Sequence, residues 1–292
     1  MITNKNKKTV SLVLGSGGAR GYAHIGVIKE LIDNGYEIKS ISGSSIGALI
    51  GGLYAAGKLD EYEEWVLNFD IFDILKLVDF SFNKNGMING NKVFEKIEEM
   101  IGDIQIEDLP IAFTATATDI TNRKQVWIQK GSLKDAIRAS IAIPTVFTPI
   151  CINGIELFDG GILNPLPIIP TLAQFTDLTV AVDLNSSSDV KKEHKEILKK
   201  EKTGIRKSIN DFIQKNIKKK DSLTYFAIIN QSIETMQEVI SRHQLASHKP
   251  DIMINISNKV CEFYDFQKAE ELIKYGRVIT KEVLESKDEN LE

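Results

Sequence analysis

Short runs in which apolar and polar residues alternate recur along the chain, and segments with helical spacing separate them. Alternation with a period of two is typical of β-strands, whereas apolar residues three and four positions apart are typical of helices that bury one face. Strands that alternate with helices predict an α/β fold, a three-layer α/β/α sandwich with a mostly parallel central sheet. The predicted strands are Thr9–Leu14, Glu37–Ser42, Ile111–Thr118, Gln125–Ile128, Ile155–Phe158, Leu178–Leu184 and Asp251–Ile256, and the predicted helices are Tyr22–Asn34, Ile46–Ala56, Gly90–Ile101 and Leu133–Ser140.

A serine lies between the second predicted strand and the helix that follows it. Residues 41–52 read ISGSSIGALIGG, so Ser45 is the centre of a G-x-S-x-G motif formed with Gly43 and Gly47. A sharp turn between a strand and a helix projects the serine hydroxyl outward, and the glycines leave no side chains to obstruct it. Ser45 is therefore a candidate nucleophile.

A glycine-rich turn follows the first predicted strand and opens the first helix, in the sequence LGSGGARGYAHIGVIKEL of residues 14–31. Such a turn directs several backbone N–H groups to one point, where the positive end of the helix dipole adds to them. The turn is therefore suited to hold a negative charge, either a phosphate or the oxyanion of an acyl-transfer intermediate.

The phosphate alternative requires a dinucleotide-binding fingerprint, and the chain departs from it at two points. Arg20 stands where the third glycine is expected, and the next strand ends in Ser42-Gly43-Ser44-Ser45 without the expected acidic residue. The oxyanion alternative fits better, because parallel strands bring the two turns to one sheet edge. The amides of Gly17, Gly18 and Ala19 are then the expected donors to the oxyanion.

A nucleophilic serine needs a base, and the chain has four histidines. His24 lies in the first helix, where packing or helix-end hydrogen bonding explains it better than a role as a base. His194 lies in a charged segment, and His243 and His248 lie in a polar helical region. Since none of the four follows a strand directly, histidine is a poor candidate.

A carboxylate is the better candidate for the base. Asp159 ends a predicted strand in the sequence IELFDGGILNPLP, and the two glycines after it leave its carboxylate unobstructed. An Asp-Gly hairpin turn explains the same local sequence, and Asp119 and Asp183 are rival carboxylates at strand ends. The role of base also requires a partly desolvated site that raises the pKa of the aspartate.

These motifs, in this order, resemble the patatin-like phospholipase family of serine lipid acyl hydrolases. Each motif alone is common, but the three together are highly specific, and the resemblance covers most of the chain from Val10 to Asp183. The residues that carry it are LGSGGARG (14–21), GSSIG (43–47), DGG (159–161) and AIRASIAIPTVFTPI (136–150), with PDIMINI (250–256) and YDFQKAEELIKYG (264–276) similar to the C-terminal part of bacterial members.

The resemblance implies a three-layer α/β/α sandwich and a Ser-Asp dyad in which Ser45 is the nucleophile and Asp159 the base. It also implies an oxyanion hole at the glycine-rich turn, action on ester-linked acyl chains of lipids, and no calcium or other cofactor. Arg20 could add positive charge near the hole or contact a lipid phosphate, and a structural salt bridge explains it equally well. The other matching positions are Gly15, Gly17, Gly18, Gly21, Gly43, Gly47, Gly160 and Gly161, while Ser16 replaces a glycine often found in the family.

Composition narrows the remaining choices. The chain has 292 residues, 42% of them hydrophobic, and a formal net charge of −4, which favours neither a nucleic-acid binder nor an acidic tail. The two cysteines lack partners at metal-ligand spacing and favour a reducing, cytoplasmic setting. The basic start of the chain resembles a signal peptide, but its apolar run is too short, and no other run is long enough to span a bilayer.

One segment differs in charge from the rest. Residues 189–221 contain twelve Lys or Arg and six Asp or Glu, so the segment carries about +6 and the rest of the chain about −10. Its apolar residues recur at helical spacing, which predicts either a solvated helix packed along one stripe or a basic amphipathic helix that contacts an anionic membrane surface. These apolar residues are Ile205, Ile209, Phe212, Ile213 and Ile217.

We therefore expect one catalytic domain over residues 8–284, with residues 186–222 as a basic helical insertion or lid and residues 285–292 as a polar tail. A lipid acyl hydrolase acting on a phospholipid or another acyl lipid is the favoured function. An acyltransferase that uses the same acyl-enzyme, and a non-catalytic lipid-binding protein, are the alternatives. The sequence leaves the oligomeric state open.

Overall fold

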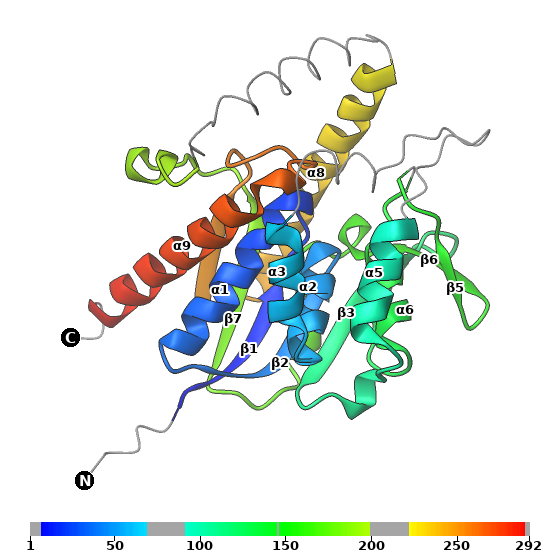
Figure 1. The fold of residues 1–292 in the computed structure, drawn as a ribbon, viewed down its shortest axis with the longest axis horizontal. Helices are drawn as coiled ribbons and strands as arrows, with labels where there is room; N and C mark the ends of the chain where they lie inside the picture. Colours follow the sequence, from blue (N-terminus) through cyan, green and yellow to red (C-terminus); the bar gives the residue numbers. More distant parts are fainter. Residues whose placement is uncertain (1–6, 69–90, 145, 199–221, 290–292) are drawn as a thin grey trace.

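The computed structural model describes residues 7–68, 91–144, 146–198 and 222–289 of the chain (Figure 1). Its strands form one mixed sheet in the order β5-β6-β3-β2-β1-β7-β8, with β4 paired to β3. The strands are β1 (Thr9–Leu14), β2 (Glu37–Ser44), β3 (Ala112–Asp119), β4 (Lys124–Ile128), β5 (Ile150–Ile152), β6 (Ile155–Asp159), β7 (Leu178–Ser186) and β8 (Ile252–Ser257).

The helices account for most of the remaining described chain. They are α1 (Tyr22–Asp33), α2 (Ile46–Ala55), α3 (Leu59–Leu67), α5 (Asn91–Ile101), α6 (Leu133–Ser140), α8 (Ser222–Ser247) and α9 (Ala269–Glu289). Two short 3-10 turns matter for the site, η1 (Gly18–Gly21) and η3 (Gly160–Ile162). The other 3-10 turns are η2 (Ile106–Asp108), η4 (Ile169–Thr171), η5 (Lys192–Lys195) and η6 (Phe266–Lys268).

The centre of the sheet is parallel, and one side of it is antiparallel. Strands β3, β2, β1, β7 and β8 run parallel, whereas β4 and β6 pair antiparallel to β3, and β5 pairs antiparallel to β6. The α/β class predicted from the sequence is thus confirmed, and all seven predicted strands are present. The additional strand, β5, and the helices α3 and α9 were not predicted, and of α8 only the polar helical region around His243 was expected.

Both faces of the central strand β1 are covered, which explains why five of its six residues are buried and four of these five are apolar. Leu12 and Leu14 belong to the large core that includes residues of α1, α2, α6 and α9. Val13 points to the other face and packs with Ala181, Leu166 and Ile168, next to Leu245 of α8. The sheet therefore lies between two layers, with α1, α2 and α9 in front in Figure 1.

Only part of the predicted basic insertion lies within the described residues. Residues 186–198 are described, and in this stretch the buried His194 contacts Glu282 of α9. The predicted amphipathic helix, from Ile205 to Ile217, lies outside the described residues. The predicted polar tail needs a correction at its start, because α9 continues as a helix to Glu289.

None of the helices within the described residues has the length and apolar character that crossing a bilayer requires.

Candidate active site

Ser45 occupies a sharp turn between β2 and α2. Its backbone has φ 55° and ψ −125°, a left-handed conformation that costs a non-glycine residue free energy and is found at functional turns. The turn brings Gly47 so close to β1 that a Cβ atom on it would lie 2.1 Å from the Leu14 carbonyl oxygen, so only glycine fits there. The Ser45 amide donates a 2.9 Å hydrogen bond to Ser140 Oγ, which fixes the turn against α6.

The Ser45 hydroxyl is directed at a carboxylate from a distant part of the chain. Ser45 Oγ donates to Asp159 Oδ2 at 2.5 Å, and the Gly161 amide donates to Asp159 Oδ1 at 2.7 Å. Asp159 lies at the end of β6, opposite Ala117 near the end of β3, and Thr118 Oγ1 donates to its carbonyl oxygen. Ser45 and Asp159 are 5% and 4% exposed, so bulk water does not separate them.

Burial changes the acid strength of Asp159. It raises the pKa of this carboxyl from 3.8 to about 7, although the hydrogen bonds from Ser45 and Gly161 act in the opposite direction. A carboxylate with a pKa near neutrality is a much better proton acceptor than an ordinary aspartate. The desolvated setting that the role of base requires is therefore present.

The glycine-rich turn lies beside this pair, but one of its three expected donors is used elsewhere. The Ala19 amide donates to the Phe263 carbonyl oxygen at 2.9 Å, so the expectation that Ala19 contributes to an oxyanion hole does not hold in this structure. The amides of Gly17 and Gly18 have no recorded partner among the described residues, as is usual for the first N–H groups of a helical turn. Gly17 and Ser45 line the same cavity.

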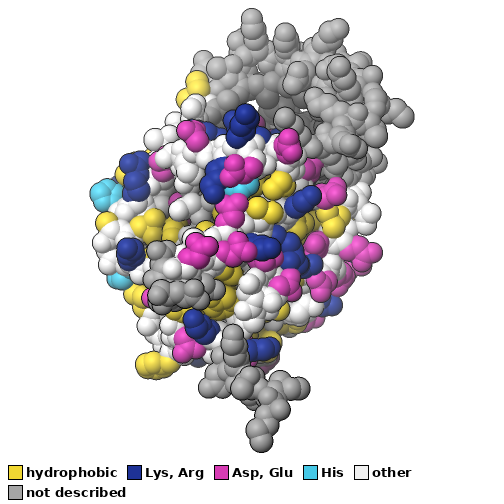
Figure 2. All heavy atoms as spheres, turned by 90° about the vertical axis from the view of Figure 1, so that its left-hand side faces the viewer, with side chains coloured by type: hydrophobic (Ala, Val, Ile, Leu, Met, Phe, Trp, Pro, Cys, Tyr) yellow, Lys and Arg dark blue, Asp and Glu magenta, His cyan; other side chains and the backbone are white. Residues whose placement is uncertain are grey.

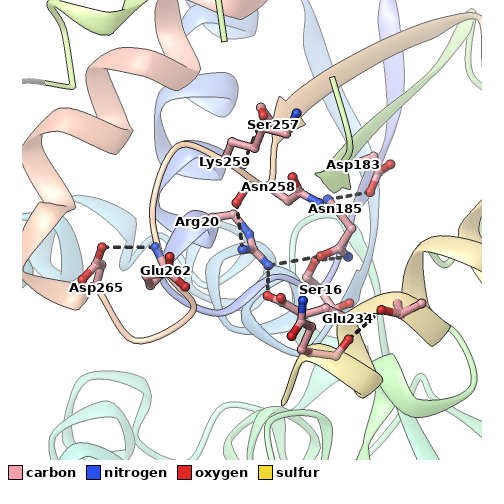
Figure 3. Close-up of polar contacts among 12 residues, drawn as sticks. Ser16, Arg20, Asp183, Asn185, Glu234, Ser257, Asn258, Lys259, Glu262 and Asp265 are labelled. Atoms are coloured by element: carbon pink, nitrogen blue, oxygen red, sulfur yellow. Dashed lines mark hydrogen bonds and ion pairs between the residues drawn. The ribbon is translucent and has the colours of Figure 1, made fainter. Parts of the chain in front are cut away.

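Arg20 lies at the back of this turn, at the centre of a polar network (Figure 3). Its Nη2 donates to Glu234 Oε1 of α8 at 2.6 Å and to Asn185 Oδ1 at 3.3 Å, while its Nη1 donates to the Asn258 carbonyl oxygen at 3.4 Å. Arg20 is only 2% exposed. The sequence left two roles open for Arg20, a positive charge near the oxyanion hole or a structural salt bridge. The structure shows a salt bridge, which joins the glycine-rich turn to Glu234 of α8.

The histidines lie away from the Ser45 hydroxyl. His24 is fully buried, and since the Gly15 carbonyl can only accept, His24 Nε2 is the donor of their 2.8 Å hydrogen bond. Burial lowers the pKa of His24 to about 4, so its imidazole is neutral at pH 7. His194 bonds to Glu282, and His243 is exposed on α8.

The rival carboxylates have other partners. Asp119 accepts from the amide and the side chain of Asn122, and Asp183 accepts from the amide of Asn185. Burial raises the pKa of Asp183, but no contact joins this carboxylate to Ser45 within the described ranges. Asp159 is therefore the strand-end carboxylate that the fold brings to the candidate nucleophile.

A small cavity of about 20 Å³ lies at the Ser45 hydroxyl. Helix α8 closes it with Ile233, Glu234 and Gln237, and the other lining residues are Ser16, Gly17, Ser45, Ile143, Pro144, Asp159, Ile162 and Phe263. Nothing in the sequence of α8 marks it as part of the site, because the helix carries none of the three motifs. A larger hollow of about 550 Å³ lies at residues 7, 8, 37, 177 and 178, and its lining includes no candidate nucleophile.

The sequence model of the family described as "Patatin-like phospholipase" matches residues 12–172, more than half of the chain. The chain belongs to the patatin-like phospholipase family. The resemblance read from its motifs is thereby confirmed, and this membership places the protein among the lipid ester hydrolases. No grouping of three or more His, Cys, Asp or Glu suited to a metal ion occurs in the described part of this patatin-like chain.

Relatives of this family member fall into two groups. An uncharacterized NTE family protein of Mycobacterium bovis is 34% identical over 98% of the chain and 94% of its own length. Lysophospholipase NTE1 of Yarrowia lipolytica is 33% identical over 62% of the chain, which spans 13% of that longer protein. Patatin-like phospholipase domain-containing protein 6 of mouse is also 33% identical over 62% of the chain and 14% of its own length.

Among solved structures, VipD from Legionella pneumophila aligns with 96% of the chain and 67% of its own chain, with 17% sequence identity and a TM-score of 0.48.

Proposed function

We propose that the protein hydrolyses ester-linked acyl chains of phospholipids with Ser45 as nucleophile and Asp159 as general base. The observation that supports this most strongly is the 2.5 Å hydrogen bond between the buried Ser45 Oγ and Asp159 Oδ2. Since the bond joins residues 114 positions apart, it depends on the fold as a whole and not on a local turn.

In the first half of the reaction, Ser45 Oγ attacks the carbonyl carbon of the ester while Asp159 accepts its proton. The amides of Gly17 and Gly18 stabilise the negative charge on the carbonyl oxygen, and loss of one such donor typically costs about 3 kcal/mol of barrier. The proton then passes from Asp159 to the leaving alcohol, and an acyl-enzyme remains on Ser45. In the second half, Asp159 activates water to release the fatty acid.

Lysophospholipids are the substrate class we propose. The support is the similarity to proteins named lysophospholipase in Yarrowia lipolytica and Emericella nidulans, each of which aligns with 62% of the chain.

The nucleophile can be tested by labelling with a fluorophosphonate probe. We expect the wild type to be labelled and Ser45→Ala to lose the label, while Ser44→Ala, a matched change at the neighbouring buried serine, keeps it. Labelling that persists in Ser45→Ala, or a wild type that is not labelled, would reject the proposed nucleophile.

The base can be tested by esterase turnover on lysophosphatidylcholine and on a p-nitrophenyl ester. Asp159→Asn should lower turnover by roughly two to four orders of magnitude, the range typical for loss of a general base. Asp119→Asn is the matched control, because it alters another buried strand-end carboxylate and should leave turnover near that of the wild type. Equal losses in both variants would contradict the assignment to Asp159.

A further inference from the structure

Two polar groups in the active-site cavity have no hydrogen-bond partner within the described part of the chain. They are the Ser16 hydroxyl, from the glycine-rich turn, and Gln237 Oε1, from α8. Ser16 and Gln237 are 1% and 6% exposed, so bulk solvent does not satisfy these atoms. A buried polar group left unpaired destabilises the fold, so this pair calls for a polar occupant of the cavity.

The two side chains converge on the backbone next to Asp159. A Cβ atom built on Gly161 would lie 2.6 Å from Gln237 Nε2, 3.0 Å from Ser16 Cβ and 3.0 Å from Asp159 Oδ1. The absence of a side chain at Gly161 is therefore what lets Gln237 and Ser16 approach the carboxylate.

The cavity has room for a water molecule. Its volume of about 20 Å³ exceeds the 10–15 Å³ or so that one water needs. A buried water typically makes about three hydrogen bonds to polar groups. Ser16 Oγ, Gln237 Oε1 and the Asp159 carboxylate can supply these bonds.

We propose that Ser16 and Gln237 hold the water that deacylates Ser45, and that α8 thereby makes the protein a hydrolase and not an acyltransferase. This inference rests on the proposed Ser45 and Asp159 chemistry. The water oxygen forms a bond to the acyl carbonyl carbon as Asp159 accepts one of its protons. The bond from that carbon to Ser45 Oγ then breaks, Ser45 Oγ recovers the proton from Asp159, and the fatty acid leaves.

The test measures how the acyl-enzyme divides between two acceptors. With p-nitrophenyl octanoate and added methanol, the ratio of methyl octanoate to octanoic acid depends only on the deacylation step, because both products arise from one acyl-enzyme. Gln237→Ala should raise this ratio about tenfold, as expected when one hydrogen bond to the attacking water is lost. Ser16→Ala should raise it in the same direction and provides a second variant should Gln237→Ala not fold.

A second readout is the acyl-enzyme itself. Slower attack by water should make the octanoyl adduct on Ser45 accumulate in Gln237→Ala, which intact-protein mass spectrometry detects. The matched control is Gln231→Ala, which removes the same side chain from the exposed face of α8 and should keep the product ratio of the wild type.

The outcomes separate this inference from the function on which it rests. A wild type that no fluorophosphonate labels overturns both. A wild type that is labelled, with a product ratio that neither Gln237→Ala nor Ser16→Ala changes, overturns only the inference about water. A change in KM for hydroxyl-bearing lipids at an unchanged product ratio also overturns it, since the two groups would then bind the substrate.

Discussion

Asp159 can accept a proton only when it is ionised, and its burial determines the pH at which this happens. Burial raises the pKa of this carboxyl to about 7, from a value of 3.8 for an exposed aspartate. The same residue therefore governs both the pH dependence of the proposed reaction and part of the pH dependence of stability.

We expect kcat/KM for a p-nitrophenyl ester to rise with pH and to reach half its maximum near pH 7, where Asp159 loses its proton. Below that midpoint the rate should fall about tenfold for each pH unit, since only the ionised fraction acts as a base. Rates measured from pH 5 to 9 provide the check, with Asp119→Asn as a control of unchanged midpoint. A flat profile across pH 6 to 8 would contradict the role of Asp159.

We also expect Asp159→Asn to raise the thermal stability at pH 8. The pKa of Asp159 is higher in the folded protein than in the unfolded chain, so near pH 8 the folded wild type carries a buried negative charge that destabilises it. As the pH falls, the folded protein takes up a proton at Asp159 and this destabilisation disappears. The gain should be on the order of 1–4 kcal/mol at pH 8 and should vanish near pH 4. Thermal unfolding of both proteins at several pH values measures it, and an unfolded variant would instead support a structural turn.

Another buried residue, His24, makes the free energy of unfolding depend on pH in the opposite direction from Asp159. Burial lowers its folded pKa to about 4, below the 6.5 of an exposed histidine, so the unfolded chain binds a proton first as the pH falls. His24 should thus remove up to about 3 kcal/mol of stability between pH 6.5 and pH 4. Relative to the wild type, His24→Gln should gain stability over this window, and a difference that does not vary with pH would contradict this account.

At the scale of elements, the bounds of a strand or helix are best predicted where turn or capping residues mark its ends. Strand β1 and helix α6 have the predicted bounds, Thr9–Leu14 and Leu133–Ser140. A glycine-rich turn ends β1, and the side chain of Ser132 caps the first turn of α6 by accepting from the Asp135 amide. The positions of Ser45 and Asp159 at strand ends were also predictable, since Gly43 and Gly47 flank Ser45, and Gly160 and Gly161 follow Asp159.

Helix α8 was not predicted as an element of the site, and its sequence shows why. Its buried face includes the polar residues Gln237 and Ser241, while Met236 and Val239 are 55% and 43% exposed. Rules that place apolar residues inside cannot orient a helix with this distribution. The capture of the Ala19 amide by Phe263 was equally hidden, because the bond joins residues 244 positions apart.

At the scale of the whole molecule, the face that α9 contributes to mixes both signs of charge (Figure 2). Lys191 pairs with Glu282 there, and Arg277 pairs with Glu30 and Asp33 of α1. Partly exposed pairs of this kind each stabilise a protein by about 0–1 kcal/mol. Binding to an anionic surface would therefore have to come from a segment with a net excess of one sign.

The basic segment 189–221 is the part of the sequence with such an excess. We expect the protein to bind phosphatidylglycerol vesicles more tightly than phosphatidylcholine vesicles, and salt to weaken the difference. Changing Lys218–Lys220 to Gln should lower the affinity for anionic vesicles by roughly tenfold or more. Changing Lys58, Lys96 and Lys130 to Gln alters the net charge equally and should have little effect, whereas equal effects would favour the solvated-helix interpretation.

The bond from the Ala19 amide to the Phe263 carbonyl has a consequence for the order in which the protein is made. All three motifs have been synthesised by residue 161, and the family match ends at residue 172. The loop next to the nucleophile nevertheless gains its backbone anchor only after Phe263 emerges, and α1 is covered only when α9 packs on it. A chain that stops between residues 172 and 263 would contain all three motifs but would lack the Phe263 carbonyl that anchors the loop. The catalytic centre can therefore be completed only after the last elements have been synthesised.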